Sequence, residues 1–96
     1  MQYQLSKERY KELEYFCLQY NHKKQIKSEN SAEGRKARID INIINHVAAS
    51  ISSEMAEYII ENVSTGKSWE QIAPPCGRRQ FYFLRRKFFY CLSKYK

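Results

Sequence analysis

Apolar residues recur along this chain every three or four positions, which is the spacing of one face of an α-helix. The pattern predicts a first helix over 6–20, with Ser6 as its N-cap. The apolar stripe of this helix consists of Tyr10, Leu13, Cys17 and Tyr20. The next segment, 21–34, is rich in Lys, Asn, Ser and Glu. We therefore expect it to be a fraying helix end followed by a loop.

Two further helices are predicted in the middle of the chain. The first spans 37–49 and repeats apolar residues every four positions. Its stripe consists of Ile39, Ile43, Val47 and Ile51, and Ile44 and Ala48 widen it. Ser52 or Ser53 can cap the second, and Gly66 is expected to stop it. The buried stripe of that helix is expected to be Met55, Ile59 and Val63.

The last third of the chain predicts a short helix, a turn and a longer basic helix. Ser68 begins a capping box, and the two prolines that follow end the short helix near Ala73. Gly77 then precedes a final helix over 78–93. A short helix, a glycine-containing turn and a longer helix are the parts of a helix-turn-helix.

These elements predict an all-α protein, a small helical bundle of about five helices that ends in a helix-turn-helix. A length of 96 residues favours a single domain over 1–96, with a helical scaffold at 1–63 and the helix-turn-helix at 66–96. The scarcity of glycine and proline argues against a sandwich or barrel. The core is expected to combine Trp69, Ile72, Phe81, Leu84 and Phe88 with Ile43, Val47 and Ile59.

The net charge of +7 lies entirely in the last fifth of the chain. Residues 1–76 contain ten basic and ten acidic side chains, whereas residues 77–96 contain seven basic ones and no acid. Such asymmetry indicates a phosphate-bearing partner, although a solvated basic helix is the alternative. At 100° per residue, Phe81, Leu84, Phe88, Cys91 and Leu92 form an apolar seam on the last helix.

The side opposite that seam carries the candidate DNA contacts. Four residues at the start of the last helix are expected to meet base edges: Arg78, Arg79, Gln80 and Tyr82. Arg86 and Lys87, further along, are expected to contact phosphates, and Arg85 flanks this side. Backbone amides near Lys67 and Ser68 are expected to hold another phosphate. Phe83, Phe89 and Tyr90 lie off the seam, and we expect them to be buried against the first helix or in a dimer interface.

Other kinds of site find little support in the sequence. The three cysteines are widely spaced, and His22 and His46 stand alone, so we expect no metal and no cofactor. No paired carboxylates, Cys–His pair or glycine-rich phosphate loop is recognisable, so we expect no enzyme. No apolar run approaches the ~18 residues of a membrane span. Free thiols and the lack of a signal-peptide core favour a cytoplasmic protein without membrane contact.

Two runs near the C-terminus resemble a known family. They are Pro75-Cys76-Gly77-Arg78-Arg79-Gln80-Phe81-Tyr82 and Arg85-Arg86-Lys87-Phe88-Phe89-Tyr90. They resemble small regulators of prophages and integrative elements in Gram-positive bacteria, of the ArpU/RinA type of phage transcription activator. Residues 11–20 resemble the N-terminal helix of these regulators, whose last two helices are similar to the promoter-reading region of sigma factors. The resemblance implies DNA recognition by Arg78, Arg79, Gln80, Tyr82, Arg85 and Arg86.

The leading hypothesis is therefore a sequence-specific regulator of a phage or mobile element that binds double-stranded DNA. One alternative is a protein-interaction module that docks on RNA polymerase or another phage protein, and the surplus of aromatic residues supports it. A second is a small packaging protein, similar to a terminase subunit. Because a lone helix-turn-helix often binds weakly, a homodimer is expected.

Overall fold

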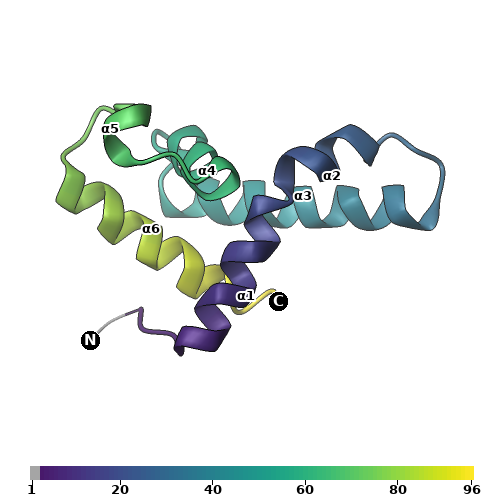
Figure 1. Cartoon of the computed structure of the whole chain (residues 1–96), viewed down its shortest axis with the longest axis horizontal. Coiled ribbons are helices and arrows are strands. Elements are labelled where there is room, and N and C mark those ends of the chain that lie inside the picture. Colours follow the sequence, from purple (N-terminus) through teal and green to yellow (C-terminus); the bar gives the residue numbers. More distant parts are fainter. Residues whose placement is uncertain (1–2) are drawn as a thin grey trace.

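Helices account for most of residues 3–96, which are the residues that the computed structural model describes (Figure 1). Within this range the six helices are α1 (Lys7–Leu18), α2 (Tyr20–Ile26), α3 (Ala32–Ile51), α4 (Ala56–Thr65), α5 (Trp69–Ile72) and α6 (Arg78–Leu92), and there is no strand. The predicted all-α class is confirmed. The described chain also has no helix that is both long and apolar enough to span a membrane.

The long helix α3 organises the others. It contacts α2, α4 and α6, while α1 packs against both α4 and α6. The described residues extend over 41 × 28 × 20 Å. In Figure 1, α2 and the first half of α3 form one end of the long axis, and α5 with the start of α6 lies at the other. The start of the basic helix is therefore remote from the α2–α3 end.

Local capping residues set several helix ends where the sequence predicts them. The Ser6 hydroxyl accepts a hydrogen bond from the Arg9 amide at 3.1 Å, so α1 begins at Lys7. Gly66 has a φ of 79°, a left-handed conformation that ends α4. Ser68 and Gln71 form both hydrogen bonds of a capping box at the start of α5. These three predictions are confirmed.

The predicted helix end and loop over 21–34 are only partly correct, because the non-helical stretch is limited to residues 27–31. Most of this segment is helical, because α2 extends to Ile26 and α3 begins at Ala32 rather than near residue 37. The Ser31 hydroxyl caps α3 by accepting from the Gly34 amide at 3.1 Å. A side chain at Gly34 would overlap the Glu29 carbonyl oxygen, so glycine permits the tight return from α2 to α3. The packing of α2 on α3 outweighs its polar composition.

The core is a single cluster drawn from α1, the start of α2, α3, α4 and α6. Its buried residues are Leu13, Cys17, Tyr20, Ile41, Ile44, Val47, Ala48, Met55, Ile59, Val63, Phe81, Phe88, Phe89 and Leu92. The predicted stripe of α4 is confirmed, and so is that of α1 and Tyr20, except that Tyr10 is only partly buried. Trp69, Leu84 and Ile43 also pack against the cluster but stay partly exposed.

The buried face of α3 matches the predicted stripe only in part. Ile44, Val47 and Ala48 of that stripe are fully buried, whereas Ile39 is 59% exposed. Apolar residues at 39, 41, 43 and 44 occupy more than one face of this helix, so its periodicity alone does not select a face. The contacts of α4 and α6 with α3 select the face that contains Ile41 and Ile44.

A matched pair of substitutions tests this orientation of α3. We expect Ile44→Ala to lower the free energy of unfolding by about 2–5 kcal/mol, because it leaves a cavity in the core. Ile39→Ala is expected to change it by only about 0.5 kcal/mol, because that side chain is exposed. Urea unfolding followed by circular dichroism measures both. Equal losses in the two variants would contradict the orientation.

Candidate nucleic-acid interface

Helix α6 has a buried side that anchors it on the other helices. Phe81, Phe88, Phe89 and Leu92 are at most 1% exposed. The Phe89 ring packs against Tyr10 of α1 with 5.0 Å between ring centroids. The prediction that Phe89 is buried against the first helix is therefore confirmed. Because Phe89 is buried, the buried side of α6 is rotated about the helix axis from the predicted seam towards Arg85. Leu84 consequently lies at the border of the buried side and is only partly buried.

The opposite side of α6 is exposed and basic. We call Arg79, Gln80, Phe83 and Arg86 the outer face of α6. All four are exposed, and with Gly77 they line an open hollow of about 650 Å³. Within residues 3–96, Arg79 and Arg86 take part in no salt bridge. This face therefore offers guanidinium and amide groups to a partner.

Arg85 does not lie on the outer face, although the resemblance implied a DNA contact for it. Its side chain is only 17% exposed. Its Nε donates to Asn62 Oδ1 at 2.6 Å, one terminal nitrogen donates to the Tyr10 hydroxyl, and the other lies 3.4 Å from Glu14 Oε2. These contacts join α6 to α1 and α4. We therefore assign Arg85 to the scaffold and remove it from the candidate interface.

Tyr82 faces α5 rather than the outer face. Its hydroxyl accepts a hydrogen bond from the Trp69 backbone amide at 3.3 Å, and its side chain is half-buried. The Trp69 indole N–H donates to the Cys76 carbonyl at 3.0 Å, which fixes the turn between α5 and α6. Tyr82 and Trp69 thus hold the geometry of the turn, and the predicted base contact by Tyr82 does not fit this arrangement.

The phosphate cradle predicted near Lys67 and Ser68 is already occupied by internal contacts. The Lys67 amide donates to Thr65 Oγ1 at 3.2 Å, and the Ser68 amide donates to Gln71 Oε1 at 2.9 Å. The Lys67 ammonium lies 3.4 Å from a Glu61 carboxylate oxygen. Because these amides have acceptors within the protein, we drop both residues from the candidate interface.

The second half of α6 is flanked by Tyr3, which precedes α1. Its ring packs edge-on against Phe83 and Tyr90, with centroid distances of 5.8 and 5.4 Å. The Lys87 ammonium lies 5.8 Å from the centre of the Tyr3 ring. Phe83 nevertheless stays 39% exposed. Phe83 is therefore not buried against the first helix, and its burial in a dimer interface stays a prediction. Tyr90 is half-buried.

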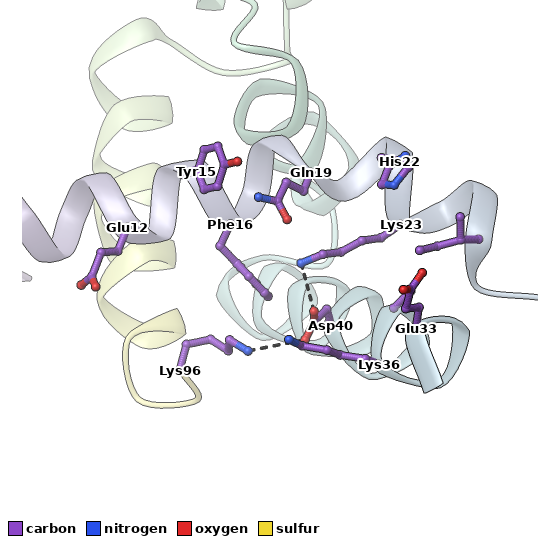
Figure 2. A pocket seen from close by; sticks show the side chains of 12 residues that line it. Glu12, Tyr15, Phe16, Gln19, His22, Lys23, Glu33, Lys36, Asp40 and Lys96 are labelled. Carbon is purple, nitrogen blue, oxygen red and sulfur yellow. Dashed lines mark hydrogen bonds and ion pairs between the residues drawn. The ribbon is translucent and has the colours of Figure 1, made fainter. Parts of the chain in front are cut away.

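A separate hollow of about 410 Å³ lies between α1–α2 and α3 (Figure 2). Its buried charge is Asp40, whose carboxylate lies 2.9 Å from the Lys23 ammonium and 3.5 Å from that of Lys96. Both ammonium groups also lie over the Phe16 ring, at 4.1 and 4.6 Å from its centre. The buried carboxylate is thus paired with two ammonium groups from other parts of the fold, so we interpret the hollow as a structural junction. Among residues 3–96, no group of His, Cys, Asp and Glu side chains could hold a metal ion.

Comparison with protein-family models, with curated proteins and with solved structures finds no match to this chain. The resemblance to phage regulators therefore stays a prediction. A function has to be inferred from the residues themselves, and the outer face of α6 is the region where exposed charge and predicted chemistry coincide.

A matched pair of neighbouring arginines tests the division of α6 into scaffold and outer face. We expect Arg85→Met to lower the free energy of unfolding by about 2–4 kcal/mol, because it leaves buried partners without their donor. Arg86→Met is expected to change it by only about 0.5 kcal/mol. Urea unfolding of both variants gives the comparison. Equal stability of the two variants would place Arg85 outside the scaffold.

The thiol of Cys17 gives a second test of the packing around α1. Burial raises the pKa of Cys17 from 9.0 to about 12, so the folded thiol stays protonated when an unfolded one ionises. The free energy of unfolding is therefore expected to fall as the pH rises from about 9 towards 12.

A labelling experiment tests the same burial. At a pH near 8.5, we expect iodoacetamide to modify Cys76 and Cys91 well before Cys17. Peptide mass spectrometry measures the rates, and all three should react alike in denaturant. Rapid labelling of Cys17 in the folded protein would contradict its burial.

Proposed function

We propose that this chain binds double-stranded DNA sequence-specifically and places α6 in the major groove. The observation that carries the proposal is the outer face of α6, where Arg79, Gln80 and Arg86 are exposed together on the side opposite the buried stripe. The scaffold contacts of Arg85 and Phe89 hold the helix in this orientation. A rigid helix with preset donors is the arrangement that base recognition requires.

The dimensions and chemistry of α6 suit a major groove. Its 15 residues correspond to a length of about 22 Å, and an α-helix fits a groove about 12 Å wide. Arg79 can donate two hydrogen bonds to guanine, and Gln80 can pair with adenine through both ends of its amide. Arg86, Lys87 and Lys94 lie further along and suit phosphates, which position a protein without reading sequence. In this proposal α5, the turn and α6 act as a helix-turn-helix.

Regulation of transcription in a phage or mobile element is the role that the resemblance implies, and we include it in the proposal. A docking role on RNA polymerase or another phage protein is the second candidate. It is favoured by exposed rings away from the outer face, since Tyr15 is 68% and Tyr95 52% exposed. Duplex selection separates the two candidates, because a docking module would enrich no duplex sequence.

Selection of bound duplexes from a random pool is the first experiment, and three variants are then titrated on the selected and scrambled duplexes. Arg79→Ala is expected to weaken the selected site by about 1–3 kcal/mol and to spare the scrambled duplex, because it removes a base contact. Arg86→Ala is expected to weaken both duplexes alike and to reduce the salt slope by about one unit, because it removes a phosphate contact. Fluorescence anisotropy at several salt concentrations measures both effects.

Arg35→Ala is the matched control, because it removes one exposed positive charge from α3 at the end remote from α6. It is expected to bind both duplexes like the wild type. Helicity is checked by circular dichroism for every variant. If all three variants bind each duplex with the affinity of the wild type, α6 is not the recognition helix, and the docking role takes precedence.

A further inference from the structure

Phe83 is the apolar member of the outer face of α6, and the fold leaves part of its ring uncovered. Phe81, Phe88 and Phe89 of the same helix are at most 1% exposed, whereas Phe83 is 39% exposed. Phe83 lies one turn beyond Arg79 and Gln80 and one turn before Arg86, so polar side chains border it on the helix surface. An aromatic ring in this setting points to an apolar group on whatever partner the arginines bind.

Two neighbouring side chains cover part of the Phe83 ring. Tyr3 packs edge-on against it at 5.8 Å between ring centroids, and the Arg86 guanidinium lies 5.9 Å from its centre. The remaining surface of Phe83 opens into the hollow that it shares with Arg79 and Gln80. A partner in this hollow would therefore meet an apolar surface between two hydrogen-bonding regions.

The major groove offers one apolar group among its base edges, the C5 methyl group of thymine. Adenine, guanine and cytosine present hydrogen-bonding groups in the major groove. A phenyl ring would remove water from these groups without replacing the lost hydrogen bonds. Resting on the proposed function, we propose that Phe83 is a specificity-determining residue that contacts a thymine methyl group in the middle of the DNA site. It would select thymine at a base pair that lies between the base pair read by Arg79 and the phosphate contacted by Arg86.

Replacement of thymine by uracil tests this contact, because it deletes the methyl group and keeps every hydrogen bond of the base pair. Each thymine of the selected duplex is replaced in turn, and the full-length wild type is titrated against each duplex. At one or two positions we expect affinity to fall about fourfold, the factor that corresponds to ~0.8 kcal/mol for one buried methyl group. In Phe83→Ala, the same replacement is expected to have no effect, and the affinity for the thymine duplex should fall to that for the uracil duplex.

Two control variants make the result specific to the ring of Phe83. Arg79→Ala should keep the preference for thymine over uracil while it loses affinity. Tyr15→Ala removes another exposed ring, on α1, and should change neither quantity. Circular dichroism is used to check that Phe83→Ala keeps its helicity, as we expect for an exposed side chain.

The outcomes separate this inference from the proposed function. If the wild type selects no duplex, both are overturned. If it selects a duplex but no uracil replacement matters, or Phe83→Ala keeps the full preference for thymine, the methyl contact is overturned and DNA binding stands. A uniform loss of affinity on every duplex in Phe83→Ala, or tighter binding to single strands than to duplexes, would likewise overturn the methyl contact.

Discussion

Three helices converge on the guanidinium group of Arg85. A largely buried charge costs several kcal/mol unless it is paired, and here Asn62 of α4 and Tyr10 and Glu14 of α1 provide the partners. Asn62 also donates to the Lys67 carbonyl at 2.7 Å, so the network extends to the turn before α5. Any rotation of α6 about its axis would break these contacts at once. Together with the buried side chains Phe81, Phe88, Phe89 and Leu92, these contacts set which side of α6 faces outward.

The division of α6 into two functions follows from that orientation. Arg85 and Arg86 are neighbours in sequence, but 100° of helical rotation separates them, so one is a scaffold residue and the other is exposed. Phe81, Phe88 and Phe89 fill the core on the first side. The outer face has no packing role to satisfy, so its residues are free to match a partner. Stability and recognition can therefore change independently in this helix.

The sequence predicted the helix ends that have a local capping residue better than it predicted the buried face of α3. Capping is local, since Ser6, Gly66 and Ser68 act on backbone groups within four residues, and each end lay where expected. The buried face of α3 depends on which partners pack against it, which a window of sequence does not contain. The partners of Arg85 lie 23, 71 and 75 residues away in the chain. Its charge therefore suggested a surface contact, whereas its tertiary contacts make it a scaffold residue.

The basic side chains of the last twenty residues are not all available to a partner. Seven basic residues lie there, but Arg85 is bound inside the scaffold, and Lys96 is paired with Asp40 between α1–α2 and α3. Arg78 pairs with Glu70 at 3.4 Å, yet both side chains are exposed. A surface pair of that kind is worth only about 0–1 kcal/mol, so a phosphate can replace the carboxylate. Two of the seven basic groups therefore contact partners within the fold, and five remain for α6 and its tail to direct towards a polyanion: Arg78, Arg79, Arg86, Lys87 and Lys94.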